Sequence, residues 1–205
     1  MAELNTIVLA TQNRDKREEL QEALSEFTVK ILSLNDFPFI GEIEEVGQTL
    51  LGNSMIKAKT VHNLTQLPVI ADDTGLEVEA LNGAPGIYSA RYAGEDVTYE
   101  DNVNKLLAEM ENIPLENRKA QFRTVISFVD KDRELWTEGT IKGIIGETAK
   151  GKNGFGYDPV FFVPELEKTF SELSIGEKNR ISHRGLAMKK FRILLREYIS
   201  DQSIT

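Results

Sequence analysis

The stretch that most constrains this chain is residues 69–75, where the small apolar run Val69-Ile70-Ala71 leads directly into two adjacent carboxylates, Asp72 and Asp73. A short apolar run of this kind predicts a buried strand, and the Thr74-Gly75 pair that follows predicts the turn that ends it. Open α/β sheets place their ligand sites where strands end. Because successive strand side chains point to opposite faces, we expect one acid to face a ligand and the other to brace the turn. The alternative is an Asx-type turn, in which the aspartates only bond nearby backbone amides.

The composition is that of an ordinary soluble protein and narrows the class of ligand. A length of 205 residues suits a single domain over residues 1–205. The absence of cysteine excludes disulfides and thiolate metal sites. A net charge of −9 argues against nonspecific binding of nucleic acid, but it allows a small polyanion held by a local basic cluster. Residues 1–13 do not resemble a signal peptide, and no apolar run approaches the roughly 20 residues of a membrane helix, so we expect a cytoplasmic protein without a membrane partner.

The first strand and helix predict a phosphate site. Residues 6–10 form a β-like run, and a helical period begins after the polar residues Thr11-Gln12-Asn13. Asn13 is a plausible N-cap, and the free N–H groups of a first helical turn bind anions. Lys16 lies in that turn, where a cation opposes the helix dipole and a bound anion would offset the conflict. The alternative is a solvated surface lysine beside an ordinary cap.

A second helix is predicted from about Thr49, shortly after a cluster of acids. Asn53 and Lys57 are spaced i, i+4 and therefore share one face of this helix. His62, near its end, is expected at the surface or as a cap. The residues expected on the buried face are Leu51, Met55, Ala58 and Val61, and the preceding acids are Glu42, Glu44 and Glu45.

The rest of the chain adds a hairpin and two more helices. Strands are expected at residues 29–34 and 76–78, a capping box opens a helix at Thr98, residues 120–129 and 134–145 form an antiparallel hairpin, and residues 160–163 form another strand. The last helix begins at about Ser182, with an apolar stripe of Phe191, Leu194, Leu195, Tyr198 and Ile199. Early alternation of strands and helices followed by a hairpin predicts an α/β fold with a mixed central sheet and flanking helices.

Residues 146–152 match six-sevenths of a P-loop pattern. The next residue is Asn153 instead of the Ser or Thr that holds magnesium, and no helix is expected after it, so we do not interpret the stretch as a P-loop. The glycines here would let backbone approach a ligand, with Phe155 or Tyr157 stacking on a flat ring. A glycine-rich hairpin loop with core aromatics is the alternative.

Basic residues gather around the start of the last helix. Ser182-His183-Arg184-Gly185 follow soon after Lys178 and Arg180. Such groups beside a helix N-terminus favour an anion or a carbonyl oxygen. An ordinary cap with solvated charges is the alternative.

Taken together, these motifs resemble one family. The chain resembles the inosine triphosphate pyrophosphatases, including the bacterial dITP/XTP pyrophosphatases, from about residue 7 to 195. The motifs that carry the resemblance, in order, are Thr11-x-Asn13-x-x-Lys16, Glu44-Glu45, Asn53-x-x-x-Lys57-Ala58, Ala71 to Gly75, Gly83 to Tyr92, Gly154 to Pro159 and Ser182 to Gly185.

The resemblance implies an activity and an architecture. The activity is magnesium-dependent hydrolysis of noncanonical purine nucleoside triphosphates (ITP, dITP, XTP) to monophosphate and pyrophosphate, which cleanses the nucleotide pool. The architecture is a two-lobed α/β fold with the substrate in the cleft, as a homodimer and without a nucleic-acid partner.

The resemblance also implies roles for particular residues. By likeness, Asp73 is the catalytic carboxylate, and Glu44 and Asp73 engage Mg²⁺. The triphosphate would be held by Thr11, Gln12, Asn13, Arg14, Asp15, Lys16 and Lys57, and the nucleoside by Thr74, Phe155, Gly156, Tyr157, Asp158, Lys178, His183 and Arg184. The chain departs from the family pattern at Gln12, where many relatives have glycine, and at Thr74, where serine is commoner.

Magnesium prefers carboxylate and phosphate oxygens and keeps several waters, so two carboxylates suffice. Lys16, Lys57 and the metal would neutralise charge that develops at phosphorus, and a carboxylate near a metal-activated water can take its proton.

Two other functions fit parts of the pattern. A Maf-type nucleotide pyrophosphatase has a related architecture, but its pattern differs at the first loop and at the base-reading end. A nucleotide-sensing module would bind without turnover and would not need both acids and the lysines. Phosphate release from ITP, GTP and dUTP, with a magnesium-free control, separates the three.

Overall fold

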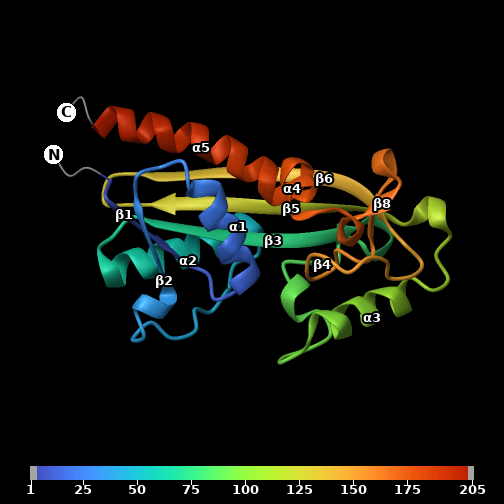
Figure 1. Cartoon of the computed structure of the whole chain (residues 1–205). Helices are drawn as coiled ribbons and strands as arrows, with labels where there is room; N and C mark the ends of the chain where they lie inside the picture. Colours follow the sequence, from blue (N-terminus) through green and yellow to red (C-terminus); the bar gives the residue numbers. More distant parts are fainter. Residues whose placement is uncertain (1–3, 203–205) are drawn as a thin grey trace. The chain divides into compact units, whose positions relative to one another are not determined.

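The computed structural model describes residues 4–202 (Figure 1). Its contacts divide the chain into two compact units. Unit 1 contains the described residues up to Asp73, then Thr124–Glu138, and the chain from Ala187 onward. Unit 2 contains Thr74–Arg123 and Gly139–Leu186. Each unit is therefore assembled from separate segments of sequence, and each is described by itself.

The strands belong to one mixed sheet with the order β2-β1-β3-β5-β6-β7-β8, and β4 pairs with β3. The strands are β1 (Thr6–Leu9), β2 (Lys30–Ser33), β3 (Val69–Val78), β4 (Pro85–Gly86), β5 (Lys119–Val129), β6 (Glu134–Ile145), β7 (Phe161–Val163) and β8 (Lys168–Thr169). β1 is parallel to β2 and β3, whereas β4 runs antiparallel to β3 and β7 antiparallel to β6 and β8. The predicted mixed α/β fold is confirmed.

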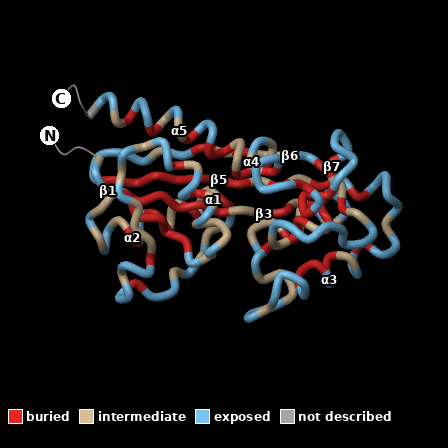
Figure 2. The backbone as a smooth tube through the Cα atoms, viewed as in Figure 1, coloured by how far each residue is buried: buried red, intermediate tan, exposed pale blue. Residues whose placement is uncertain are grey.

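Unit 1 is built in layers on the alternation of β1. Ile7 and Leu9 belong to one buried cluster and Val8 to another, because successive strand residues face opposite sides. Figure 2 shows β1 as mostly buried. The first cluster receives apolar residues of α1 (Arg14–Leu24) and α5 (His183–Gln202). The second receives Ala58 and Val61 of α2 (Leu50–Thr65). Both faces of the first strand are therefore covered, as expected for parallel strands.

Unit 2 has its own apolar core of large aromatic side chains. Phe122, Phe161 and Phe170 pack against one another with ring centroids 4.7–5.9 Å apart. Val103 and Leu106 of α3 (Tyr99–Glu109) join the same cluster. A short helix, α4 (Ile175–Ile181), precedes α5, and single 3₁₀ turns lie at Leu34–Asp36, Glu79–Leu81, Ser89–Arg91, Leu115–Asn117, Pro164–Leu166 and Phe170–Glu172.

Most predicted elements are present, and their caps follow the local sequence. The Asn13 side chain accepts a hydrogen bond from the N–H of Lys16, and Thr98 forms a capping box with Asp101. β5 and β6 are neighbours joined by residues 130–133, with the Asp130 N–H donating to the Arg133 carbonyl, which confirms the hairpin. The Nδ1 of His62 donates to the carbonyl oxygen of Leu67 just beyond α2, as expected of a residue at the helix end.

Three expectations are corrected. The turn predicted at Thr74-Gly75 is absent, because β3 continues unbroken from Val69 to Val78 and Leu76 pairs with Gly86. The two aspartates therefore lie in the middle of a strand. On α2, the polar residues Asn53, Ser54 and Lys57 are buried, while Leu51 and Met55 are only partly so. The third difference is α4, a helix that the sequence analysis does not predict, although Ser174 and Glu177 form a capping box at its start.

Within residues 4–202, no helix combines the length and the apolar character needed to cross a membrane.

Candidate functional site

The centre of the unit 1 site is the ammonium group of Lys57, on α2. Its Nζ lies 2.9 Å from Glu45 Oε1 and 3.6 Å from Asp73 Oδ1. Lys57 and Asp73 are 9% and 6% exposed, so solvent screens this group weakly. The lysine is brought to the acids because it lies on the buried face of a helix packed against β3.

Burial and charge act against each other at this group. Burial raises the pKa of Asp73 above its ordinary value, and the charges of Lys57 and Lys16 do not fully offset that effect. Burial alone would lower the pKa of Lys57, but Asp73, Glu45 and Asp72 outweigh it, and its pKa is raised. Lys57 is therefore protonated at neutral pH, while Asp73 is a stronger proton acceptor than an exposed aspartate.

The second acid, Asp72, meets a different lysine. Asp72 is fully buried, and its Oδ2 lies 3.3 Å from Nζ of Lys16, which belongs to the first turn of α1. The loop before that turn is ordered locally, since Thr11 Oγ1 accepts from the Asn13 N–H and Asn13 Oδ1 from the Lys16 N–H. The predicted phosphate loop is thereby tied to β3 through an ion pair.

Other residues of this loop differ in their placement. Arg14 pairs with Glu18 at 2.7 Å along α1, with a side chain that is 78% exposed, and Asp15 lies in the same first turn. Gln12 is exposed and lines a cavity of about 560 Å³ together with Leu34, Asn35, Pro38 and Ile40. Arg14 thus needs to leave Glu18 before it can contact a phosphate.

The acid that reaches Lys57 is Glu45, whereas Glu44 was the residue proposed from sequence. Glu44 is exposed, and Glu45 is partly buried against the lysine. Of the two neighbouring acids, Glu45 is therefore the one beside Lys57, and it is our candidate for the metal set. The sequence left open which of the two would be the ligand, and the assignment of Glu44 stays a prediction.

Unit 2 brings together a second group of predicted residues around Phe155. Arg184, which is 2% exposed, donates from Nη2 to Thr74 Oγ1 at 3.1 Å. The guanidinium carbon of Arg184 lies 5.6 Å from the centroid of the Phe155 ring, and Lys178 Nζ lies 4.7 Å from it. Residues from β3, α4, α5 and the loop after β6 thus converge in this unit, with donors beside an aromatic face.

The Phe155 loop is held by a buried ion pair. Lys178 Nζ lies 2.5 Å from Asp158 Oδ2, and the same carboxylate accepts from the Phe155 N–H at 2.9 Å. A Cβ on Gly154 would lie 2.0 Å from that oxygen, so Gly154 is required by the approach of Asp158. Asp158 therefore shapes the loop from within.

Two predicted nucleoside-site residues lie in the apolar core of unit 2. Tyr157 is 4% exposed and donates its hydroxyl to the Ser89 carbonyl, so its ring is not placed to stack on a base. His183 is 3% exposed and stacks on Phe122 with centroids 4.5 Å apart. Gly156 has positive φ, and a Cβ there would meet nothing within 4 Å. Of the two aromatic candidates, Phe155 is the one that remains partly exposed.

The P-loop-like stretch is a loop, as expected. No helix follows it, since residues 151–160 contain only bends and turns. Gly151 has a φ of +86°, and a Cβ there would lie 2.3 Å from the Ser171 carbonyl. Close packing of the protein against itself explains this glycine, where sequence reasoning had favoured approach to a ligand.

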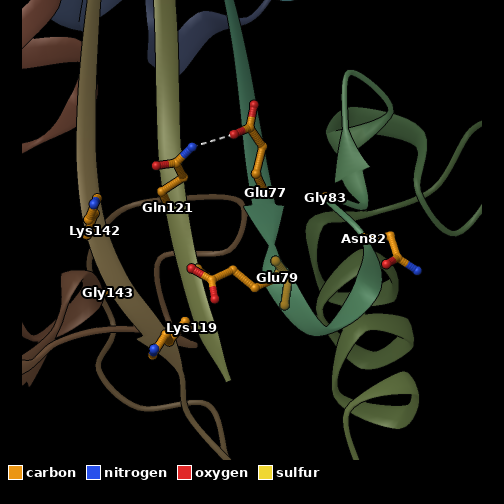
Figure 3. A pocket seen from close by; sticks show the side chains of 10 residues that line it. Glu77, Glu79, Asn82, Gly83, Lys119, Gln121, Lys142 and Gly143 are labelled. Atoms are coloured by element: carbon orange, nitrogen blue, oxygen red, sulfur yellow. Dashed lines mark hydrogen bonds between the residues drawn. The ribbon is translucent and has the colours of Figure 1, made fainter. Parts of the chain in front are cut away.

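Unit 2 contains a cavity of about 630 Å³. Figure 3 shows the side chains that line it. It is lined by Glu77, Val78, Glu79, Asn82, Gly83, Lys119, Ala120, Gln121, Lys142 and Gly143. The Gln121 amide donates to Glu77 across it. None of the residues predicted for the site lines this cavity, so its size does not make it the candidate site.

The unit 1 group suits a hard divalent cation such as Mg²⁺. Among residues 4–202, no set of three or more His, Asp or Glu side chains could hold a metal by itself. Magnesium is usually held by one or two carboxylates together with substrate phosphates and water, and Glu45 and Asp73 provide such a pair. Three carboxylates stand against the two lysines, so a divalent cation would also make the group attractive to a polyanion.

An open α/β sheet with a helix N-terminus, two lysines and three carboxylates at one strand is an arrangement suited to phosphorylated ligands. Residues 7–194 match the Ham1 family. A dITP/XTP pyrophosphatase of Thermoanaerobacter pseudethanolicus is 50% identical over 186 residues, which is 91% of this chain and 94% of that protein. One from Bacillus cereus is 43% identical over 201 residues, covering 97% and 98%. The chain belongs to the Ham1 family.

Solved structures agree with that assignment. The Staphylococcus aureus Ham1 protein superimposes with a TM-score of 0.86 at 39% identity, over 95% of this chain and all (100%) of that one. A HAM1 protein from Coxiella burnetii gives 0.87 at 41% identity, over 94% and 99%. The fold is therefore that of the family throughout the matched region.

Proposed function

We propose that this chain hydrolyses dITP, XTP and ITP to the monophosphate and pyrophosphate, with Mg²⁺ as the cofactor. Family membership and curated relatives that carry the name dITP/XTP pyrophosphatase support a nucleoside triphosphate pyrophosphatase. The structural observation that carries the proposal is the Lys57 group, in which a buried lysine lies between two carboxylates. A site that only bound a polyanion would be weakened by those acids, whereas hydrolysis requires them.

In this proposal the unit 1 residues bind the triphosphate and take up a proton. Lys16, Lys57 and the N–H groups at the start of α1 bind phosphate oxygens. Asp73 accepts a proton from the attacking water. Asp73 and Glu45 would hold Mg²⁺, which when bound neutralises phosphate charge and activates water. Lys57 keeps both carboxylates oriented while the ligand is absent.

The unit 2 residues bind the nucleoside in the same proposal. Phe155 offers a ring for stacking, and Arg184 offers a donor for the oxygen at C6 that hypoxanthine and xanthine share. Adenine presents an amino group there, which would face the guanidinium donor to donor. Guanine keeps the oxygen, so its exclusion requires a wall against the 2-amino group, for which the backbone of Phe155 and Gly156 is our candidate.

The deciding assay is pyrophosphate release from dITP, XTP, ITP, GTP, dUTP and ATP, with and without magnesium. We expect turnover of the first three that depends on magnesium. Preference for dUTP or a pyrimidine would favour a Maf-type specificity, and tight binding without turnover would favour a sensing module. A homodimer and a cytoplasmic location remain predictions, and sedimentation of the purified chain tests the first.

A further inference from the structure

Asn53 lies one helical turn before Lys57 and takes no direct part in the proposed reaction. Its side chain is fully buried at the start of α2, where polar side chains require a structural reason. Its Oδ1 accepts a hydrogen bond from the backbone N–H of Gly47 at 2.8 Å. Gly47 stands two residues after Glu45, in the loop that carries this acid to Lys57.

The contact between Asn53 and Gly47 is tight enough to require glycine. A Cβ on Gly47 would lie 2.5 Å from Asn53 Oδ1 and 2.9 Å from the Asn53 backbone nitrogen, closer than real side chains approach. Thr49 continues the attachment, since its hydroxyl accepts from the Gly52 N–H and its carbonyl from the Asn53 N–H. The loop is thereby fixed to the first turn of the same helix that holds Lys57 one turn later.

We propose that Asn53 is a positioning residue: its hydrogen bond to Gly47 holds Glu45 against Lys57 and thereby keeps this acid ready for magnesium. The magnesium role of Glu45 rests on the proposed function, whereas the hydrogen bond at Gly47 and the ion pair with Lys57 do not. Residues 41–49 contain no helix or strand, so elements of regular structure do not define the place of Glu45. The ion pair between Glu45 and Lys57, at 2.9 Å, then depends on the hydrogen bond from Gly47 to Asn53.

The test compares Asn53→Leu with Ser54→Ala. Leucine keeps the branching of asparagine at Cγ, with a somewhat larger volume, but removes the acceptor. Ser54 is a matched control, because it is also fully buried on α2 and loses a hydrogen bond to Ser127, at 2.6 Å, without touching the loop. Gly47→Ala breaks the same attachment from the other side and serves if Asn53→Leu folds poorly.

Two measurements are made on each variant. Hydrogen exchange of the peptide that contains Gly47 should accelerate by about tenfold or more in Asn53→Leu and Gly47→Ala, and should not change in Ser54→Ala. The magnesium concentration for half-maximal ITP hydrolysis should rise several-fold in the same two variants, with kcat at saturating magnesium close to wild type. In a chain that already carries Glu45→Gln, adding Asn53→Leu should not raise the half-maximal magnesium concentration further, because Asn53 acts only through Glu45.

Each alternative result has a separate meaning. Unchanged exchange at Gly47, an equal magnesium effect in Ser54→Ala, or a rise that persists in Glu45→Gln would overturn the proposal. If the wild-type chain hydrolyses none of the nucleotides, the proposed function fails instead. The melting temperatures of Asn53→Leu, Glu45→Gln and the double variant are then compared. If the two single changes in melting temperature simply add in the double variant, the positioning role is overturned.

Discussion

Asp73 is held in a place that disfavours its own charge. Burial raises its pKa despite Lys57 at 3.6 Å. A carboxyl whose pKa is higher in the folded than in the unfolded chain lowers stability above that folded pKa, and the effect disappears below the unfolded pKa of about 3.9. The residue proposed for proton transfer thus has a cost in stability that its removal should relieve.

Asp73→Asn should lower kcat/KM for ITP by about 100-fold or more, because an amide neither accepts the proton nor holds magnesium well. At neutral pH its melting temperature should equal or exceed that of wild type, and the difference should disappear as the pH falls toward about 4. Steady-state kinetics and thermal unfolding from pH 4 to 8 test both statements. Retention of more than about a tenth of the activity would remove Asp73 from the catalytic role.

Asp72→Asn should mainly lower stability, whereas Asp73→Asn mainly lowers the reaction rate. Asp72 is fully buried against Lys16, whose side chain is 17% exposed, so the change leaves a partly buried cation without its partner. We expect a loss of about 1–3 kcal/mol in the free energy of unfolding, measured by denaturant titration, that is at least as evident as any loss of rate. A large kinetic defect at unchanged stability would contradict this division between the two acids.

Arg184→Ala should narrow the preference for ITP and XTP over ATP. Loss of the donor to the C6 oxygen should reduce kcat/KM for ITP and XTP by about 10- to 100-fold, while ATP loses less. Arg184→Met keeps much of the apolar stem of this buried side chain and serves as the folding control. An equal reduction of kcat/KM for ITP, XTP, GTP and ATP would show that Arg184 binds phosphate or supports the structure, and that other residues select the base.

At the scale of elements, α1 couples a cap to the proposed phosphate site. Asn13 satisfies the N–H of Lys16, and the ammonium of that lysine reaches β3 at Asp72. The cap can be kept while its charge is changed, since serine and aspartate cap helices about as well as asparagine.

Asn13→Ser and Asn13→Asp should therefore unfold at similar temperatures, whereas Asn13→Ala should lose about 1 kcal/mol of stability. The aspartate variant should raise KM for ITP by roughly 10-fold, because its charge opposes the triphosphate at short range. Thermal unfolding and KM measured on all three variants test the prediction. Similar KM values for the serine and aspartate variants would place the triphosphate elsewhere.

At the scale of the whole molecule, the net charge of −9 and the excess of carboxylates in the Lys57 group both oppose a nucleoside triphosphate. A divalent cation reverses the local balance. Binding of the polyanion and the metal should therefore be mutually dependent.

The α,β-methylene analogue of ITP should consequently stabilise the chain only when magnesium is present. At about 100 times its dissociation constant a ligand adds about 2.7 kcal/mol, which for a chain of this size corresponds to roughly 5–10 °C. Thermal unfolding with each component alone and with both together measures the linkage. A full shift from the analogue without magnesium would contradict a shared site.

Much of the fold follows from short-range sequence signals. The caps at Asn13, Thr49 and Thr98 and the β5–β6 hairpin depend on residues within a few positions of one another, and they are predictable for that reason. The shared face of Asn53 and Lys57 follows from helical period alone. The capping box of α4 was equally local and was overlooked.

Other features were decided by contacts between distant segments. β3 passes through Thr74-Gly75 because Leu76 and Glu77 pair with Gly86 and Pro85 of β4, ten and eight residues further along the chain. The hydroxyl of the buried Tyr157 donates to the carbonyl of Ser89, and Glu45, not its neighbour Glu44, meets Lys57 of α2. The sequence by itself determined the elements and the kinds of side chain available for the chemistry, since propensity and capping act over a few residues. Only the tertiary structure decided which acid meets which lysine, because hydrogen bonds and burial between remote segments select among neighbours that the local sequence leaves equivalent.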